Sequence, residues 1–302
     1  MNIKNWISAF RLKTIPLALA SMLLGNFLAY SLGEFSFIIA ALSILTCIAL
    51  QILSNLANDY GDAVNGVDNE YRVGPARAVQ SGLISPEVMK KGIYFFIALS
   101  LLFGLGLLYF SFKEVMTLSF LLFFILGVFA IAAAIKYTVG KNPYGYNGLG
   151  DVFVLLFFGW IAVLGTVFLH RHAIEILFFL PATSIGLLAV GVLNLNNMRD
   201  ANQDKEVGKN TLAIKLGENK VKAYHTALII IAMLCAVLFA ILTFQSAYQW
   251  LFLISFIPLS LHIKRVLDNK IPAHLDPELK KLALSTLFFS ILFGIAICLR
   301  SF

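Results

Sequence analysis

Charged side chains are scarce in this sequence, and residues 35–58 contain none at all. Asp, Glu, Lys and Arg together make up 13% of the 302 residues, whereas hydrophobic residues make up 60%. A soluble globular chain carries about 25% charged residues, so this composition excludes an ordinary soluble enzyme. Cysteine is rare as well. Cys47, Cys235 and Cys298 lie inside apolar runs without C-x-x-C spacing, which excludes a disulfide framework and a cysteine metal site.

The sequence contains long apolar runs. A helix needs about 20 mostly apolar residues to cross a bilayer, and nine stretches meet this requirement. They lie near 15–33, 36–57, 92–111, 115–135, 150–169, 174–195, 223–243, 247–263 and 282–300. Ahead of them, Ile3, Trp6, Ile7 and Phe10 recur at helical spacing, which predicts an amphipathic helix at the membrane surface. The sequence therefore predicts an all-α membrane protein.

The basic residues are distributed unevenly between the two sides of the predicted membrane. Of the 23 Lys and Arg residues, 20 fall on the side of the N-terminus, and only Lys113, Arg171 and Arg300 fall on the other. Because positively charged loops stay in the cytoplasm, the N-terminus and the long segments 58–91 and 196–222 are predicted to be cytoplasmic. Topology thus explains the net charge of +7, and no nucleic-acid partner is expected.

Acidic residues gather in two polar stretches that each follow directly on an apolar run. These stretches, at 55–68 and 196–204, form a weak internal repeat about 140 residues apart. Because residues i and i+4 share a helix face, Asn58 is expected beside Asp62, and Asn196 beside Asp200 and Asp204. A charged group within a bilayer costs about 2.5–3.5 kcal/mol or more. Both clusters therefore need a compensating cation.

The residue types in the two stretches indicate a metal and a diphosphate. Neither stretch contains His, which counts against zinc, and carboxylate and amide oxygens suit Mg²⁺, which often completes its shell with substrate phosphates. Basic side chains that could bind phosphate oxygens flank both stretches: Arg72, Arg77, Arg199, Lys205 and Lys209. The alternative is that both stretches are solvated helix ends with ordinary caps and cytoplasmic charges.

A third polar segment, residues 136–151, is rich in tyrosine and glycine and lies on the same side of the membrane. Its tyrosines, Tyr137, Tyr144 and Tyr146, together with Asp151, predict the floor or lid of a pocket for an aromatic substrate. The alternative is an aromatic belt at the membrane interface with glycines in its turns.

At these residues the chain resembles the UbiA superfamily of membrane prenyltransferases. The first family motif matches Asn58-Asp59-Tyr60-Gly61-Asp62 followed by Asp68, and the second matches Asp200-Ala201-Asn202-Gln203-Asp204. Segments 137–138, 143–146 and 148–151 are most similar to the branch that prenylates 1,4-dihydroxy-2-naphthoate in menaquinone biosynthesis. Arg11, Thr14 and Pro16 also match the start of the family. The resemblance extends over essentially the whole chain.

The resemblance implies a single integral-membrane domain, residues 1–302, with nine helices around one central cavity. It implies an enzyme of the bacterial cytoplasmic (inner) membrane with its active site on the cytoplasmic side. The reaction implied is the Mg²⁺-dependent transfer of a polyprenyl chain from polyprenyl diphosphate to 1,4-dihydroxy-2-naphthoate. Diphosphate and CO2 would be released, and demethylmenaquinone would form.

The family's functional residues are carried over to matching positions of this sequence. The Mg²⁺-diphosphate would be held by Asn58, Asp62, Asn196, Asp200 and Asp204, with Asp59 and Asp68 as helpers. The diphosphate would be bound by Arg72, Arg77, Lys136, Arg199 and Lys209. The acceptor pocket would contain Tyr137, Tyr144 and Tyr146, and the candidates for an acceptor-side base are Asp68 and Asp151.

Two other functions stay open at this point. One is a prenyltransferase of the same kind with another aromatic acceptor, such as 4-hydroxybenzoate. The other is a secondary transporter, whose ion site would lie near the middle of broken helices. The centres of the predicted helices here are almost free of acidic residues, which favours the enzyme.

Overall fold

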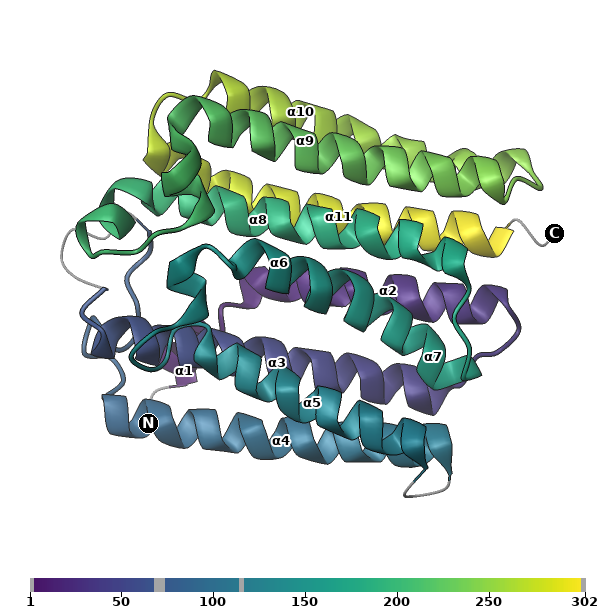
Figure 1. Ribbon diagram of the computed structural model, residues 1–302, viewed down its shortest axis with the longest axis horizontal. Helices are drawn as coiled ribbons and strands as arrows, with labels where there is room; N and C mark the ends of the chain where they lie inside the picture. The colour runs from purple at the N-terminus through teal and green to yellow at the C-terminus, as the bar shows by residue number, and fades with distance from the viewer. Residues whose placement is uncertain (1–2, 68–73, 114–116, 300–302) are drawn as a thin grey trace.

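The described part of the chain consists of helices and the segments that join them. The computed structural model describes residues 3–67, 74–113 and 117–299. The helices in Figure 1 are α1 (Ile3–Phe10), α2 (Ile15–Ser31), α3 (Phe37–Val64), α4 (Pro86–Phe112), α5 (Leu118–Lys136), α6 (Gly150–Val154), α7 (Gly165–Arg171), α8 (Phe179–Glu206), α9 (Leu212–Leu242), α10 (Phe256–Asp268) and α11 (Asp276–Cys298). A π-helix, Leu155–Leu164, joins α6 to α7. Short 3₁₀ segments occupy Leu12–Thr14, Tyr144–Asn147, Ile176–Phe178, Ala247–Ser255 and Pro272–Leu275.

Nine segments of the described chain are long and apolar enough to cross a membrane, which confirms the predicted number. The main difference between the predicted and the observed helices lies at their polar ends. Helix α3 continues to Val64 and α8 to Glu206, beyond the expected ends at 57 and 195. A helix satisfies its own backbone hydrogen bonds, so polar residues can extend it past the bilayer. The described residues of both acidic clusters therefore lie on the last turns of α3 and α8, as the helical spacing of their Asn and Asp residues indicated.

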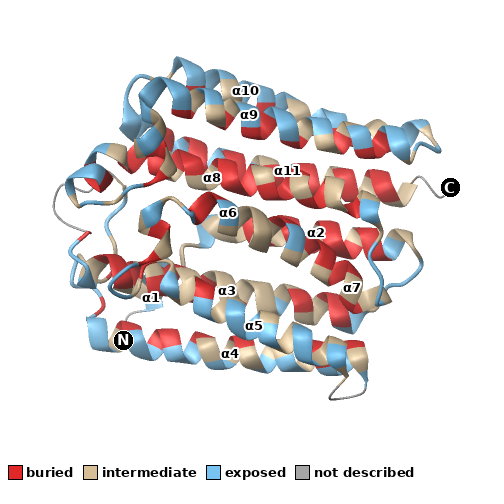
Figure 2. Cartoon of the chain, viewed as in Figure 1, coloured by how far each residue is buried: buried red, intermediate tan, exposed pale blue. Residues whose placement is uncertain are grey.

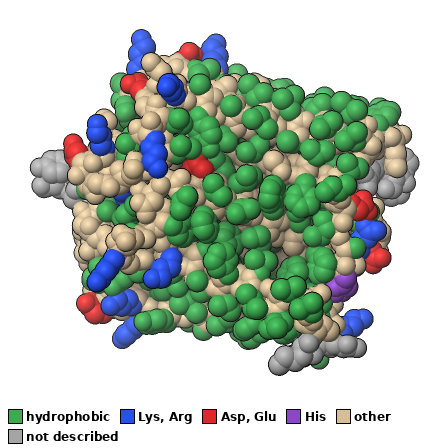
Figure 3. Space-filling view, in the orientation of Figure 1, with side chains coloured by type: hydrophobic (Ala, Val, Ile, Leu, Met, Phe, Trp, Pro, Cys, Tyr) green, Lys and Arg blue, Asp and Glu red, His purple; other side chains and the backbone are tan. Residues whose placement is uncertain are grey.

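The outer surface is apolar along most of the bundle, and its basic side chains are concentrated at one end (Figure 3). On the face shown in Figure 3, hydrophobic side chains cover the middle, and most Lys and Arg gather at the end that carries the N-terminus in Figure 1. Leu118, Ile125 and Phe129 of α5 are exposed, while α2, α8 and α11 hold many of the buried residues (Figure 2). An apolar belt of this extent is expected at a lipid interface, so the chain is a multi-pass membrane protein.

Helices α3 and α8 end in the same type of turn. In each, a glycine with positive φ follows the C-cap residue: Gly66 at 71° and Gly208 at 78°. The next amide donates to the carbonyl five residues back, which belongs to Asp62 in α3 (2.9 Å) and to Asp204 in α8 (2.8 Å). This arrangement is the Schellman motif, in which glycine avoids the strain of the left-handed conformation. The weak sequence repeat is thus a repeated helix end with an aspartate on its last turn.

The segment that follows α5 packs directly on the last turns of α3. The Thr138 hydroxyl lies 3.1 Å from both the Ala57 carbonyl oxygen and Asn58 Oδ1, and the Asn65 side-chain amide donates to the Thr138 carbonyl at 2.9 Å. Gly61 permits this approach. A Cβ at Gly61 would lie 2.7 Å from Thr138 Oγ1 and 2.8 Å from the Thr138 carbonyl carbon.

We expect Gly61→Ala to lower the midpoint of thermal denaturation of the detergent-solubilised protein, because the added methyl group must displace Thr138. Overpacking of this kind costs about 1–3 kcal/mol. Gly127→Ala on α5 is the matched control, because no neighbouring atom lies within 4 Å of the added Cβ, and it should leave the midpoint unchanged or slightly raised. Equal midpoints for the two variants would contradict this contact.

Candidate functional site

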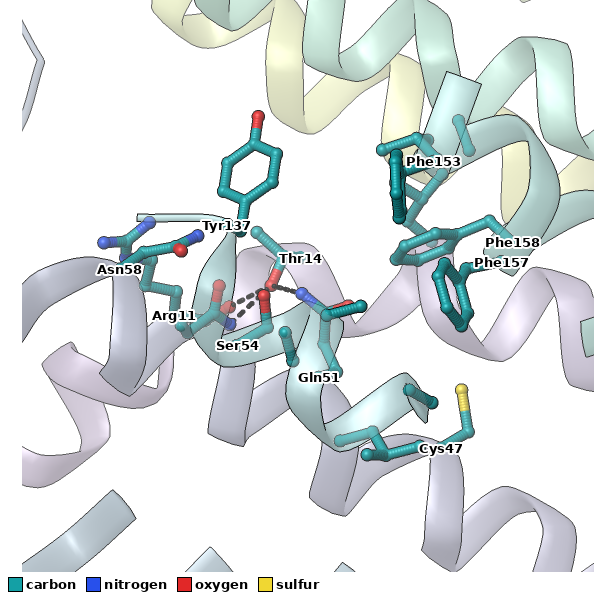
Figure 4. A pocket seen from close by; sticks show the side chains of 18 of the residues that line it. Arg11, Thr14, Cys47, Gln51, Ser54, Asn58, Tyr137, Phe153, Phe157 and Phe158 are labelled. Carbon is teal, nitrogen blue, oxygen red and sulfur yellow. Dashed lines mark hydrogen bonds between the residues drawn. The ribbon is translucent and has the colours of Figure 1, made fainter. Parts of the chain in front are cut away.

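A cavity of about 760 Å³ lies inside the bundle. Its wall includes residues of α2, α3, α5, α8 and the π-helix, together with the segment that follows α5. Polar and apolar side chains occupy different parts of this wall. Figure 4 shows the polar side chains of Arg11, Thr14, Ser54, Asn58 and Tyr137 on one side and the rings of Phe153, Phe157 and Phe158 on the other. The cavity thus has one region suited to charge and another suited to an apolar chain.

The π-helix forms much of the apolar wall. Pairs of lining residues recur at every fourth position, at 153–154, 157–158, 161–162 and 165–166. An α-helix has about 3.6 residues per turn, so side chains spaced four residues apart would shift progressively round its axis. The wider turns of the π-helix, with their i→i+5 hydrogen bonds, offset this shift and keep the lining residues on one face. Gly159 allows the π-helix to lie close to α8, because a Cβ there would be 3.0 Å from the Gly186 Cα.

Asp62 lies at the centre of the first acidic cluster. Its Oδ1 accepts a hydrogen bond from the Tyr146 hydroxyl at 2.7 Å, and its Oδ2 lies 3.4 Å from an Arg77 guanidinium nitrogen. The Asp62 side chain is only 5% exposed. Asn58, one helical turn earlier, lines the same cavity. The structure therefore places Asn58 and Asp62 together, on the shared face that their spacing indicates.

Asp59 is directed instead to the segment that precedes α4. Its two carboxylate oxygens accept hydrogen bonds from the backbone amides of Ala78 (3.0 Å) and Val79 (3.1 Å), and the residue is 1% exposed. Asp59 thereby fixes the backbone next to Arg77, whose guanidinium reaches Asp62. Asp59 also borders the cavity. The two backbone hydrogen bonds favour a supporting role for this residue.

In the second cluster, Asp200 is paired with the neighbouring Arg199. Nε and one terminal nitrogen of the guanidinium each donate to a different Asp200 oxygen at 2.7 Å, and that terminal nitrogen also donates to Asn196 Oδ1 at 2.8 Å. Asn196 and Asp200 both line the cavity. Arg199 thus binds Asn196 and Asp200, two of the five side chains predicted to hold the metal, and its guanidinium donors are engaged by protein groups where the sequence predicted a diphosphate.

Lys209 links the two clusters. Its ammonium nitrogen lies 3.1 Å from Asp204 Oδ1 and 3.8 Å from Asp62 Oδ1, and it also lies 4.7 Å from the centre of the Tyr146 ring. The Schellman turn at Gly208 positions this residue, because it brings the chain back over the end of α8. A cation therefore lies between an aspartate of α3 and an aspartate of α8.

The electrostatics of the two helix ends favour cations. The C-terminus of a helix carries a partial negative charge, and both α3 and α8 add an aspartate to that end. The predicted oxygen ligands Asn58, Asp62, Asn196, Asp200 and Asp204 all line the one cavity. Within the described residues, no three His, Cys, Asp or Glu side chains converge on one point. This donor set fits Mg²⁺, which usually takes one or two carboxylates and fills the rest of its shell with water and phosphate oxygens.

The three predicted tyrosines all border the cavity. Tyr146 donates to Asp62, and Tyr144 donates to the Ala133 carbonyl at 2.9 Å. Burial raises the pKa of Tyr144 to about 12 and raises the pKa of Tyr137 as well. Both phenols therefore stay protonated at neutral pH, so they can donate hydrogen bonds but cannot act as bases.

Two predicted site residues do not belong to the cavity wall that the described residues form. Lys136 is exposed at the end of α5. Asp151 accepts a hydrogen bond from the hydroxyl of Tyr224 on α9 at 2.8 Å, away from the lining residues. Asp68 and Arg72 lie outside the described residues, so their predicted roles stay predictions.

Several polar lining residues received no role from the sequence. Gln51 and Ser54 lie one turn apart on α3, and the Thr14 hydroxyl accepts hydrogen bonds from Gln51 (3.1 Å) and Asn55 (3.0 Å). Arg11 lines the cavity with a left-handed backbone, φ 49°. Polar residues within an apolar run were an available signal for Gln51 and Ser54, whereas the conformation of Arg11 has no sequence signal.

The fold and the cavity define a class of protein: a multi-pass membrane protein with an internal cavity that is acidic at one end and aromatic in its depth. Residues 18–297 match the UbiA prenyltransferase family. The chain belongs to this family.

Relatives with assigned names cover nearly the full chain. The chain is 42% identical over 294 residues to 1,4-dihydroxy-2-naphthoate octaprenyltransferase of Escherichia coli, an alignment that covers 97% of this chain and 95% of the relative. It is 43% identical over 297 residues to the Haemophilus influenzae protein of the same name, with 98% and 96% covered.

Solved structures share the fold at low sequence identity. A UbiA homologue from Aeropyrum pernix matches with a TM-score of 0.67 at 14% identity, covering 100% of both chains. A UbiA homologue from Archaeoglobus fulgidus, bound to DMAPP and Mg²⁺, matches with a TM-score of 0.56 at 17% identity, covering 95% of this chain and 98% of that one. These likenesses support the all-helical fold of the described residues.

We expect Asp59→Ala to destabilise the protein more than Asp62→Asn. The first change leaves one buried and one partly buried backbone amide without an acceptor, at a cost of about 1–3 kcal/mol for a buried unsatisfied group. The second change keeps an oxygen that can accept from Tyr146. Thermal denaturation midpoints in detergent compare the two variants. A lower midpoint for Asp62→Asn would contradict the supporting role of Asp59.

Proposed function

We propose that this protein transfers a polyprenyl chain from polyprenyl diphosphate to 1,4-dihydroxy-2-naphthoate, with Mg²⁺ as cofactor. The observation that carries the proposal is the single cavity in which two acidic helix ends meet an aromatic wall. The names of the relatives that align over nearly the whole chain support the acceptor. The Mg²⁺ and prenyl diphosphate named for a structure of the same fold support the cofactor and the donor.

The diphosphate would lie at the acidic end of the cavity. Asn58, Asp62, Asn196, Asp200 and Asp204 would hold Mg²⁺, and the bound metal would supply positive charge that stabilises the departing diphosphate. Arg77 and Lys209 border the cavity next to Asp62. Their cationic groups are of the kind that binds phosphate oxygens through charge-assisted hydrogen bonds. Arg77 and Lys209 would thus bind the diphosphate.

The first chemical step would break the bond between the allylic carbon and the diphosphate oxygen, and the oxygen would keep the electron pair. The resulting allylic cation must be protected from water until the acceptor attacks. The aromatic wall at Phe153, Phe157 and Phe158 provides an apolar environment for the prenyl chain, and ring faces can stabilise a cation. Tyr146, whose ring already lies near the Lys209 ammonium, is placed closer to the diphosphate end.

The acceptor would lie against the polar wall. Its carboxylate needs a cationic partner, and Arg11 lines the cavity near Asn58 (Figure 4). When the ring carbon that bears the carboxylate attacks the allylic cation, CO2 leaves and its bonding electron pair returns to the ring. No ring proton is lost in this step, so the formation of the carbon–carbon bond itself consumes no base. The product is a dihydroxynaphthalene, and its two-electron oxidation gives the quinone form, demethylmenaquinone.

The proposed location is the bacterial inner membrane, with the acidic end of the cavity on the cytoplasmic side. The excess of Lys and Arg at the end that holds the N-terminus supports this orientation. A water-soluble diphosphate product could then leave directly into the cytoplasm, while the prenylated product stays in the lipid.

We expect Asp62→Asn and Asp200→Asn each to lower prenyl transfer by at least about 100-fold, because each removes a charge that stabilises the metal and the leaving group. Transfer of radiolabelled prenyl groups in detergent or proteoliposomes measures the loss. Glu175→Gln is the matched control: it removes an acid that pairs with Arg171 outside the cavity wall, and its activity should equal that of the wild type. Near-normal activity of either aspartate variant would refute its assignment.

Removal of the metal and exchange of the acceptor test the cofactor and the substrate separately. EDTA should abolish transfer, and added Mg²⁺ should restore it. With one prenyl diphosphate as donor, 1,4-dihydroxy-2-naphthoate should be prenylated with release of CO2, and 4-hydroxybenzoate should not be prenylated. Prenylation of 4-hydroxybenzoate in preference to the naphthoate would replace the proposed acceptor, while activity that persists in EDTA would exclude the proposed cofactor.

A further inference from the structure

The guanidinium of Arg199 is almost fully occupied by protein groups. Besides the bonds to Asp200 and Asn196, its second terminal nitrogen donates to the carboxylate of Asp276. Four of the five N–H donors of the guanidinium are thus engaged, and the side chain is only 2% exposed. Arg199 therefore presents one edge to the cavity side chains and the opposite edge to Asp276.

Asp276 comes from a different part of the fold. It is the first residue of α11, and α11 packs against α8. Its carboxylate therefore reaches Arg199 from a neighbouring helix, and Lys13, near the N-terminus, lies 3.8 Å from the same Asp276 oxygen. Asp276 is absent from the cavity wall that the described residues form. It can influence the cavity through Arg199.

Charge sharing gives Asp276 a definite effect on Asp200. A bidentate pair of one arginine and one aspartate is close to neutral and attracts a divalent cation weakly. The Asp276 carboxylate binds the opposite edge of the same guanidinium and partly neutralises its positive charge. The group of Arg199, Asp200 and Asp276 therefore carries a net charge of about −1. The Lys13 and Asp276 side chains are 40% and 33% exposed, so solvent screens the charges of both, but only Asp276 acts directly on the buried Arg199, from which its carboxylate accepts a hydrogen bond. Asp200 therefore keeps much of its negative potential toward the cavity.

We propose that Asp276 is a positioning residue for the metal-diphosphate site: it holds Arg199 in a fixed orientation and keeps Asp200 and Asn196 available to the metal. This inference rests on the proposed function. Groups that orient metal ligands from behind typically change metal affinity by about 10–100-fold when they are removed. Because Arg199 is partly neutralised here by a second acid, the loss of Asp276 should weaken metal binding more than it slows the chemical step.

Metal binding without turnover provides the test. Mn²⁺ serves as the probe, added to the full-length protein in detergent together with inorganic diphosphate, and free Mn²⁺ is followed by electron paramagnetic resonance. Asp276→Asn should raise the Mn²⁺ dissociation constant by about tenfold, and Asp276→Ser, a second neutral variant, should do the same. Asp276→Glu retains the charge and should bind Mn²⁺ more tightly than either neutral variant.

Asp268→Asn is the charge-matched control. It removes an exposed acid at the end of α10, outside the cavity wall, and should leave the dissociation constant unchanged. In prenyl-transfer assays, the neutral Asp276 variants should need about tenfold more Mg²⁺ for half-maximal rate and should recover most of the wild-type rate at saturating Mg²⁺. A purely structural role would lower the maximal rate and the denaturation midpoint without this shift.

Two further results would overturn the inference. If wild-type protein binds Mn²⁺ with diphosphate and the neutral Asp276 variants bind it equally well, Asp276 has no positioning role while the proposed function stands. If wild-type protein shows neither diphosphate-dependent Mn²⁺ binding nor prenyl transfer, the proposed function fails and the inference fails with it.

Discussion

The site depends on the compensation of acidic charge at two helix ends that converge at one end of the cavity. An aspartate at a helix C-terminus is opposed by the negative end of the helix dipole, and Asp62 and Asp204 both occupy such positions. Lys209 lies within 4 Å of both carboxylates, while Arg77 and Arg199 pair with Asp62 and Asp200. Without these cations the ends of α3 and α8 would repel each other. With these cations in place, the carboxylates of Asp62, Asp200 and Asp204 form an acidic cluster that can bind further cations.

The surrounding fold holds this acidic cluster in a fixed geometry. Helices α3 and α8 extend past the apolar region as regular helices and then turn sharply at Gly66 and Gly208, so the aspartates lie on rigid elements. The tyrosine-rich segment after α5 packs on α3 through Thr138 and places the Tyr146 hydroxyl on Asp62. The π-helix then provides an apolar wall away from the acids. Charged and apolar parts of one substrate thus have separate places in one cavity.

Much of this arrangement could be predicted from the sequence. The nine spans follow from the length and apolarity of the runs, because a bilayer admits few other structures. The spacing of Asn58 and Asp62, and of Asn196 and Asp200, indicated a shared helix face, and the structure places all four at the cavity. Asp59 follows Asn58 directly and so lies about 100° round the helix from that face, where its carboxylate accepts two hydrogen bonds from backbone amides.

Other assignments needed contacts between distant parts of the chain. Residue type and the family resemblance made Lys136, Arg199 and Asp151 predicted site residues, yet Lys136 is exposed, Arg199 is bound by two aspartates and Asp151 is bound by Tyr224. Asp276 had no sequence signal beyond that of an acid in the first turn of a helix. Side-chain partners depend on which helices pack together. The apolar pattern of a span predicts that it contacts lipid or other helices, but it does not predict which helices these are.

The sequence by itself determined that this is a nine-span membrane protein with two matched acidic helix ends on one side, because burial of apolar area and helical periodicity are local properties. Only the tertiary structure decided how the charges are shared: Lys209 lies between Asp62 and Asp204, and Arg199 lies between Asp200 and Asp276. Electrostatic partnership depends on distances of a few ångströms between helices, and those distances are fixed by packing.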